Sequence, residues 1–547
     1  LRIVLSIKLS AHTTSLTHHD DALMIKGAML NSYFGYQDDF TLVKNISYQV
    51  FLFVTHLSGL PYTVVMALVW VGTASLAVIV MRKFIKSRAY LLFVYTVILF
   101  CPTGLDVLVG TRIYRNSIIA PCVFIIILTM LGLVLTVAAK NRTPKKILPW
   151  AVGLGFMLSF TYYIQESGQW MLLPFLVTIL ACLGILVHEY LIKNKDNKVL
   201  LKLGVITLLP VVIFVGLTNV YKAINYHYFG VYEINMRTSG QPGEYLANVY
   251  KVYSKNRTPT VWAPADAIEA TFKVSPTLSK HQELLAHIET TGWYQGDIHK
   301  HPINGDFLSW VLHDALIQSN LAPSKKFVND FFKSVNAELT NAFKTGKLKK
   351  DNKLQISKMG GGRTINQVLE LRPLVLLGIR SNLMYYGYDP GGELSECKEV
   401  DFCQLANYVT NGDVRNYTPG TSAAHAYAHE QAIANSFVLQ IIHIYKYIGL
   451  ALFIGGLAGL LVSLSRIFIR KNTLINAIML VTMIILLISA SIVILGAAWF
   501  TEFLLNPIWV MKFYSVAAAP LVMLFGLIGT YFLAHYSYSK LRKSKLL

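Results

Sequence analysis

Basic residues gather in the short linkers between the hydrophobic segments of this chain. Positively charged residues beside membrane-spanning segments are retained on the cytoplasmic side of the membrane. The distribution therefore predicts an orientation in which every basic linker lies inside and the remaining loops face outward. The five basic groups are Arg82, Lys83, Lys86 and Arg88; Lys140, Arg142, Lys145 and Lys146; Lys193, Lys195, Lys198 and Lys202; Arg466, Arg470 and Lys471; and Lys540, Arg542, Lys543 and Lys545.

The composition agrees with a membrane protein. Of the 547 residues, 54% are hydrophobic and 14% are charged, which is too apolar for a soluble protein of this length. The net charge of +20 would suggest a nucleic-acid partner if it were spread over a soluble surface. It is not, because residues 224–437 are nearly neutral and the excess belongs to the membrane part. We therefore expect membrane lipids as partners and no nucleic acid.

Apolar windows long enough to cross a bilayer need about 17–25 residues. Alternating the predicted windows across the membrane puts every basic group inside, so the fold class is mainly α: a polytopic helical membrane protein with about nine visible spans. The windows are 61–81, 89–104, 116–139, 147–164, 171–192, 200–222, 441–465, 474–498 and 509–535.

Four regions follow from these windows. Residues 1–60 form a first outer loop with an acidic pair, and residues 61–223 form a membrane domain with six spans. Residues 224–437 form a large extracytoplasmic domain, mixed or mainly helical, in which 324–347 has a helical pattern. Residues 438–547 add three spans and a basic cytoplasmic tail.

Two further expectations concern the N-terminus and the cysteines. The first complete span runs inward, so residue 1 starts outside, and we expect one more helix before it, missing from this sequence. Cys397 and Cys403 face outward in the predicted topology, where an oxidising exterior allows a disulfide between them. Two free thiols are the alternative.

Chemistry is first sought in the outward loops. The acidic pair Asp20 and Asp21 precedes an apolar helical run, which can place a carboxylate where a general base is needed. The alternative is structural, because aspartate is a favoured N-cap residue and either side chain could cap a helix over 22–30. The spacing of the residues alone favours the structural alternative.

A set of loose motifs gives the chain a resemblance to the GT-C superfamily of polytopic glycosyltransferases, which use polyprenyl-phosphate sugars. The superfamily includes the protein O-mannosyltransferase and aminoarabinose lipid A transferase families, and the chain resembles more closely a group of bacterial membrane proteins that share this first loop. The likeness covers roughly the first 260 residues and, more faintly, residues 325–350. Its motifs are Asp20-Asp21, Tyr36-Gln37-Asp38 with Leu42-Val43-Lys44, Arg112-Ile113-Tyr114-Arg115, Glu166 leading into Trp170, and Tyr228-Phe229-Gly230-Val231.

The resemblance implies roles for individual residues. An acid of the first outer loop lies at the reaction centre in that superfamily, so Asp20 or Asp21 becomes the candidate catalytic base. Arg112, Arg115 and Lys44 become candidates for binding the donor phosphate, since guanidinium groups bind phosphate oxygens bidentately. Glu166 becomes a second acid of the site.

The alternatives to these roles are ordinary ones. Arg112 and Arg115 could contact lipid headgroups or form a salt bridge with Asp106. Lys44 is followed by Asn45-Ile46-Ser47, where related transferases often carry a proline- or glycine-containing turn. Glu166 could be a hydrated loop residue.

Metal and nucleotide chemistry are not indicated. His425 and His429 lie four positions apart but lack the glutamate of a zinc-protease motif and a third ligand. Gly360-Gly361-Gly362 precedes Arg363 rather than the Lys-Ser/Thr of a phosphate-binding loop, and predicts a turn. We expect no cofactor, although a divalent cation near the acidic pair stays open.

Two hypotheses from different classes remain. The first is a GT-C-like enzyme of the bacterial cytoplasmic membrane that moves a sugar from a polyprenyl-phosphate donor to an envelope glycan, lipid or protein on the outer face. The second is a transporter or envelope-assembly scaffold whose outer domain binds a polymer or partner. Transporters tend to place ionisable residues near mid-membrane, whereas the charges here gather at the ends of the spans. That distribution favours a site at the outer surface.

Overall fold

The computed structural model of the chain consists of helices joined by loops, and its described residues contain isolated bridges but no β-strand. The described residues are 1–13, 18–29, 40–193, 197–291, 296–391, 400–412, 414, 421–468 and 474–544.

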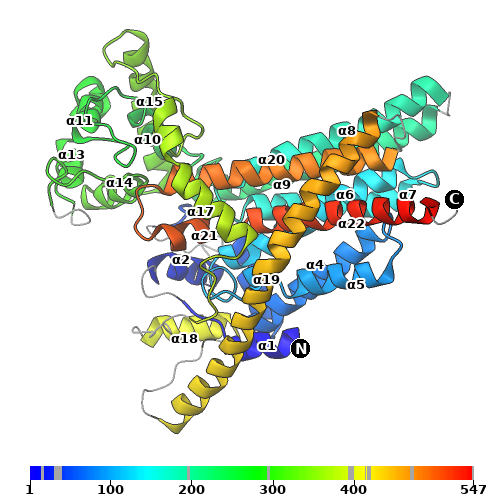
Figure 1. Cartoon of the computed structure of the whole chain (residues 1–547). Helices are drawn as coiled ribbons and strands as arrows, with labels where there is room; N and C mark the ends of the chain where they lie inside the picture. Colours follow the sequence, from blue (N-terminus) through cyan, green and yellow to red (C-terminus); the bar gives the residue numbers. More distant parts are fainter. Residues whose placement is uncertain are drawn as a thin grey trace.

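The centre of the molecule is a bundle of long apolar helices that run side by side (Figure 1). The helices of the bundle are α4 (Tyr62–Met81), α5 (Arg88–Leu99), α6 (Asn116–Ala138), α7 (Pro144–Tyr162), α8 (Leu172–Lys193), α9 (Asn197–Phe229), α19 (Ser422–Phe468), α20 (Leu474–Thr501) and α22 (Ala518–Ser544). Helix α6 is buried along nearly its whole length, so it forms the core around which the others pack.

Seven helices in the described part are long and apolar enough to cross a membrane. They correspond to α4, α6, α8, α9, α19, α20 and α22, so the prediction of a mainly helical multi-pass membrane protein is confirmed at this level. The other two predicted windows also form helices. Helix α5 has 12 residues and is continued only by the short turn η3 (Pro102–Gly104), and α7 begins with Pro144, Lys145 and Lys146.

The last predicted span is wrong in its boundaries. The window 509–535 is divided between α21 (Pro507–Ser515) and α22. Pro520, in the first turn of α22, has no N–H to donate to an upstream carbonyl, so a continuous helix would lose a hydrogen bond there. Helix α19 also begins well before the predicted window 441–465 and extends beyond the bundle (Figure 1).

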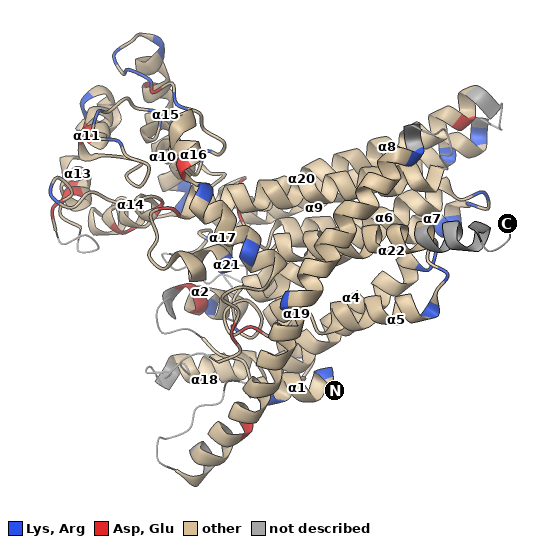
Figure 2. Ribbon diagram, viewed as in Figure 1, with Lys and Arg blue, Asp and Glu red and all other residues tan. Residues whose placement is uncertain are grey.

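Charge is distributed unevenly along the bundle (Figure 2). Lysine and arginine gather at the end where the C-terminus lies, in the connections between α4 and α5 and between α6 and α7. Most acidic residues lie toward the opposite end and in the helices that project from it. The two described linkers, between α4 and α5 and between α6 and α7, therefore lie at the same end of the bundle.

Helices α19 and α22 approach so closely that their backbones touch. A Cβ added to Gly459 would lie 2.0 Å from the carbonyl oxygen of Gly529, and one added to Gly529 would lie 2.6 Å from Cα of Gly456. Gly526 faces Leu452 with similar crowding. Small residues at such a contact let membrane helices pack at short range, which fixes the register of the two helices.

A second hydrophobic core lies in a lateral subdomain, residues 230–363, that projects from the bundle (Figure 1). The predicted helix over 324–347 is observed as α15, and Ser324 caps it by accepting a hydrogen bond from the N–H of Phe327 at 3.1 Å. The subdomain consists of α10 (Gln241–Val249), α11 (Ala265–Val274), α12 (Pro276–Ser279), α13 (Gln282–Glu289), α14 (Phe307–Gln318) and α15 (Lys325–Lys344).

The remaining helices of the described part, apart from α21, are short and lie outside the long helices of the bundle. The predicted unit 224–437 therefore includes two parts, because Leu371, Phe402 and Ala434 belong to the core of the bundle and not to the second core. The short helices are α1 (Arg2–Leu9), α2 (His18–Met29), α3 (Ser47–Leu57), η4 (Gly168–Met171), α16 (Ile365–Glu370), α17 (Arg372–Leu383) and α18 (Val400–Val409).

A glycine-rich joint fastens the lateral subdomain to the end of α20. A Cβ added to Gly361 would lie 2.7 Å from Cδ1 of Trp262, and the indole N–H of Trp499 donates to the Gly361 carbonyl at 3.2 Å. Arg363 is 1% exposed, donates to the Trp499 carbonyl at 2.8 Å and ion-pairs with Glu502. The glycines that predicted a turn thus let two tryptophans close on the loop.

Candidate functional site

Asp20 and Lys44 form an ion pair at the end of the bundle. Asp20 lies in the first turn of α2, and its Oδ1 is 2.8 Å from the Lys44 ammonium, with side-chain exposures of 31% and 4% respectively. Because Asp20 and Asp21 lie inside the helix, neither occupies its N-cap position. The lysine is therefore buried against a carboxylate that still reaches the surface.

The turn over residues 40–46 holds Lys44 in place. Leu42 adopts a left-handed conformation with φ 64°, which costs an L-residue roughly 1–2 kcal/mol. The Leu42 carbonyl accepts from the Met236 N–H at 2.8 Å, and its side chain is buried in the second core. Asn45 accepts from Asn235 at 2.7 Å. These contacts with the lateral subdomain offset the strain.

Asp21 and Arg112 form a fully buried pair. The Arg112 Nε donates to both Asp21 oxygens at 3.0 and 3.1 Å, and Nη2 donates to Oδ1 at 2.6 Å. Exposures of 0% for Asp21 and 1% for Arg112 leave neither in reach of a ligand. The resemblance implied that Asp20 or Asp21 is the catalytic base and that Arg112 binds the donor phosphate, whereas the burial of Asp21 and Arg112 indicates a structural pair that joins α2 to the loop before α6. Removing one partner of such a pair typically costs about 3–5 kcal/mol.

Arg115 and Glu166 form a third pair, 2.5 Å apart, with exposures of 12% and 6%. Within the described part of the chain, Arg115 Nε and Glu166 Oε1 are buried without a hydrogen-bond partner. A buried polar atom left unpaired costs about 1–3 kcal/mol, so these two atoms mark a place where a polar ligand would be stabilised. The two alternatives, a salt bridge from Arg115 to Asp106 and a hydrated Glu166, do not match this geometry.

These six residues form what we call the charge cluster: Asp20, Asp21, Lys44, Arg112, Arg115 and Glu166. Burial raises the pKa of the Asp20 carboxyl, but Lys44, Arg115 and Arg112 outweigh that effect and hold the pKa well below its ordinary value. Burial likewise raises the pKa of Glu166, and Arg115 with Lys44 lowers it further than burial raises it. Both carboxyls are therefore ionised at neutral pH.

Lys44 titrates close to neutral pH. Burial lowers the pKa of its ammonium to about 8, with Asp20 acting in the opposite direction and Arg115 and Arg237 adding to the decrease. The lysine is thus mostly charged at pH 7 and loses its proton under mildly alkaline conditions.

Residues of the lateral subdomain that the sequence did not suggest extend the cluster. The Lys44 ammonium lies 5.0 Å from the centre of the Trp310 ring, and the Arg237 guanidinium lies 5.0 Å from the same ring. Arg237 ion-pairs with Asp306 and donates from Nε to Ser309 at 3.1 Å. No motif surrounds Arg237 or Trp310, so only the tertiary structure reveals them.

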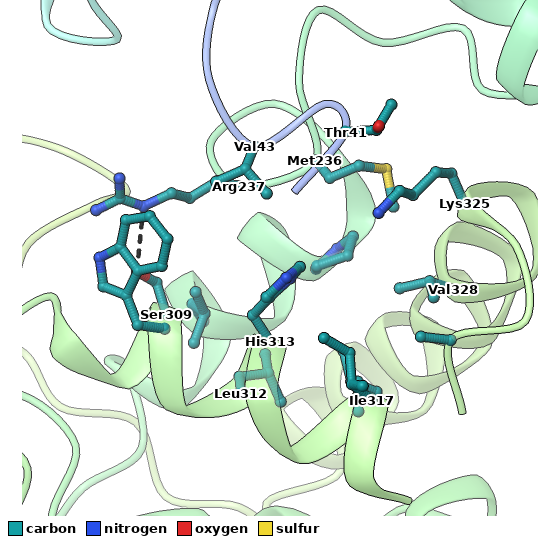
Figure 3. Close-up of a pocket in the computed structure, with 15 residues that line it drawn as sticks. Thr41, Val43, Met236, Arg237, Ser309, Leu312, His313, Ile317, Lys325 and Val328 are labelled. Atoms are coloured by element: carbon teal, nitrogen blue, oxygen red, sulfur yellow. Dashed lines mark hydrogen bonds between the residues drawn. The ribbon is translucent and has the colours of Figure 1, made fainter. Parts of the chain in front are cut away.

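A pocket lies directly beyond Trp310, between the 40–46 turn and helices α10, α14 and α15 (Figure 3). It encloses ≈ 680 Å³ of empty space, part of it open to solvent. Lys325 and His313 point into the pocket, and the hydrogen bond from Arg237 to Ser309 lies at its edge. Its lining residues are Thr41, Val43, Met236, Arg237, Pro242, Leu246, Ser309, Trp310, Leu312, His313, Leu316, Ile317, Ala322, Lys325 and Val328.

Asp106 does not pair with the arginines of the cluster. It binds the Lys512 ammonium at 2.8 Å and accepts from the N–H groups of Leu108, Val109 and Asp389. Lys512 also donates to the Gly387 carbonyl at 2.9 Å. This saturated pair connects the loop before Arg112 to α21 and fixes that loop.

A metal could be held elsewhere in the described part. Ligand atoms of Glu269, Glu289 and His299 lie within 4.8 Å of one another on the lateral subdomain. The three residues belong to α11, α13 and the loop after α13, and none of them belongs to the charge cluster. His299 is exposed, so the group has the character of a surface site.

Several predicted residues lie outside the described part. They are Tyr36, Gln37, Asp38 and Cys397. Cys403 takes part in a disulfide bond, and its pairing with Cys397 stays a prediction. Comparisons with models of known protein families, with curated proteins and with solved structures give no match to this chain.

Proposed function

We propose that the chain is a GT-C-like glycosyltransferase that moves a sugar from a polyprenyl-phosphate donor to an acceptor of the cell envelope. The observation that carries the proposal is the Asp20–Lys44 pair: an accessible carboxylate, ionised at neutral pH, held 2.8 Å from a buried ammonium. Arg115 supplies a second cation with an unpaired Nε, within the described part, beside this pair.

The proposed topology puts this site at the outer face of the bacterial cytoplasmic membrane. The charge cluster lies at the end of the bundle opposite the basic linkers, which the positive-inside rule assigns to the cytoplasm. In this topology the nine helices of the bundle cross the membrane, with α5 as the short crossing, and the C-terminus lies inside. A polyprenyl-phosphate donor anchored in the outer leaflet then presents its phosphate at the level of the cluster.

Asp20 acts on the acceptor in this proposal. Its carboxylate accepts a hydrogen bond from the acceptor hydroxyl and takes the hydroxyl proton as the bond between the acceptor oxygen and the sugar carbon forms. Lys44 makes Asp20 a weak base by lowering its pKa, so the proton moves late, when the attacking hydroxyl has become acidic. Orientation of that hydroxyl is accordingly the larger contribution.

Arg115 and Lys44 act on the leaving group. The bond between the sugar carbon and the phosphate oxygen breaks, and the polyprenyl phosphate leaves with the bonding electrons and gains negative charge. Fixed cations in a site with little water stabilise such charge strongly. Arg112 contributes indirectly, because its buried pair with Asp21 fixes α2, and with it Asp20, against the loop that carries Arg115.

The test is transfer of radiolabelled sugar from a panel of polyprenyl-phosphate sugars in membranes that contain native envelope material. We expect transfer by the wild type and a loss of about 100-fold or more in Asp20→Asn, the usual effect of removing a positioned acid or base. Glu283→Gln, which alters an exposed carboxylate of the lateral subdomain, is the matched control.

The Asp21→Asn variant distinguishes the structural role of Asp21 from the proposed catalytic role of Asp20. This substitution leaves the charge of Arg112 buried beside a neutral amide, so we expect less folded protein rather than folded, inactive protein. Wild-type transfer by well-folded Asp20→Asn protein would exclude Asp20 as the catalytic group. Absence of transfer from every donor by the folded wild type would exclude the proposed function.

A further inference from the structure

The pocket beyond Trp310 is an apolar cavity with a basic edge, next to the charge cluster. Trp310 forms the boundary between the two, since Lys44 and Arg237 both contact its ring while the ring itself lines the pocket. The side chains of Trp310 and Lys44 would therefore lie between a molecule in this pocket and Asp20.

The chemistry of the walls restricts what the pocket can hold. Most of the lining is aliphatic, including Leu246, Leu316 and Val328, which favours a hydrocarbon or aromatic segment. Among the lining residues that the structure describes, Arg237, Lys325 and His313 have basic side chains and none carries a carboxylate, although Arg237 is already paired with Asp306. The pocket thus combines an apolar wall with a basic edge, which suits an amphipathic anion and disfavours a neutral sugar chain.

We infer that this pocket binds the acceptor, and that the acceptor is an amphipathic molecule with an apolar segment and an anionic group. The inference rests on the proposed function, because it assigns the second substrate of the same reaction. The apolar segment lies against α10, α14 and α15, the anion lies near Lys325, and the reacting hydroxyl extends past Trp310 toward Asp20. Lipid-like or lipid-linked envelope molecules have this chemistry, whereas soluble neutral polysaccharides do not.

Two pairs of matched variants test the pocket, in α15 and in the loop that precedes it. Ala322 lines the pocket, so Ala322→Phe fills it, whereas Ala337→Phe adds the same ring on the exposed face of α15. Lys325→Gln removes a charge from the pocket, whereas Lys326→Gln removes its exposed neighbour, which pairs with Asp330.

The experiment is calorimetric titration of the full chain, in phosphatidylcholine nanodiscs, with hexyl phosphate as the amphipathic anion and hexanol as its uncharged counterpart. We expect saturable binding of hexyl phosphate and at least tenfold weaker binding of hexanol. Ala322→Phe and Lys325→Gln should each weaken hexyl phosphate binding at least tenfold relative to Ala337→Phe and Lys326→Gln. Thermal unfolding of each variant verifies its folding, and Lys325→Gln carries the test if Ala322→Phe does not fold.

A second readout connects the pocket to the acceptor. Hexyl phosphate should inhibit sugar transfer in competition with the acceptor, and about tenfold less strongly in Lys325→Gln than in Lys326→Gln. Equal binding and equal inhibition across each matched pair would overturn the inference while sugar transfer itself persists. If hexyl phosphate binds as expected but no sugar is transferred from any donor, the proposed function is wrong. The assignment of the pocket to an acceptor is then also wrong, and the pocket is a binding site for an amphipathic anion of another kind.

Discussion

At the scale of single residues, the sequence identified the members of the charge cluster but not their pairing. Asp20, Lys44, Arg115 and Glu166 do lie together, whereas Asp106 pairs with Lys512 instead of an arginine. Pairing depends on how α2, the 40–46 turn and the loop before α6 meet, which no local pattern encodes. Trp310 and Arg237 could not be predicted for the same reason, since both come from a subdomain with its own core.

Lys44 gives the site a predicted alkaline limit. Burial lowers the pKa of its ammonium to about 8, so its charge, and with it donor binding, should decline as the pH rises through that value. We expect the transfer rate at a low donor concentration to fall about tenfold between roughly pH 7 and pH 9, following the loss of the proton from one group. Measuring that rate against pH for the wild type and Lys44→Arg checks this, because an arginine keeps its charge and removes the decline.

The same titration should not unfold the protein. The pKa of folded Lys44 lies below the ordinary lysine value of about 10.4, so the unfolded chain holds more protons between about pH 8 and 10.4. Stability attributable to this group therefore rises with pH across that window. A parallel loss of folding above pH 8 would show that activity is lost for another reason.

At the scale of elements, the joint between the lateral subdomain and α20 depends on a loop that looked like an ordinary turn. Gly360, Gly361 and Gly362 gave a turn signal, but the sequence could not show that Trp262 and Trp499 close on that turn. Glycine is needed here because of close approach, and close approach is a property of the packed structure. The joint in turn supports the elements that carry Trp310 and Arg237.

Gly361→Ala should loosen this joint. The added methyl group would lie 2.7 Å from Trp262, so the indole must shift, and overpacking of this kind typically costs about 1–3 kcal/mol. We expect a lower thermal unfolding midpoint, measured on purified protein. Gly184→Ala, in α8, is the control, since nothing lies within 4 Å of the added Cβ. Equal midpoints for the two variants would mean that the tryptophans do not need the glycine.

At the scale of the whole molecule, the hydrophobic windows predicted the helices well because length and apolarity are properties of the sequence itself. The divisions between cores were harder to predict, since residues 224–437 contribute to both the bundle and the lateral subdomain. The window 509–535 failed because a break between two apolar helices leaves almost no mark in hydropathy. The basic linkers, by contrast, predict an orientation that stays a prediction, although the linkers between α4 and α5 and between α6 and α7 lie at the same end of the bundle.

That orientation can be tested by labelling from outside. Lys145, at the start of α7, and Lys333, on α15, are both exposed, and cysteine can replace each. In intact cells, a membrane-impermeant maleimide should label Lys333→Cys and should reach Lys145→Cys only after permeabilisation. The native free cysteines Cys101, Cys122 and Cys182 are buried, so the background should be low. The reverse labelling pattern would place the charge cluster on the cytoplasmic side and exclude an outer-face reaction.

The backbone contact between α19 and α22 limits how the molecule can move. Gly459 packs directly against Gly529, so neither helix can rotate or slide along the other without a steric clash. Helix α19 is continuous from Ser422 to Phe468, so its projecting end is connected through one rigid helix to the contact with α22. Displacement of this end relative to that contact therefore requires the helix to bend.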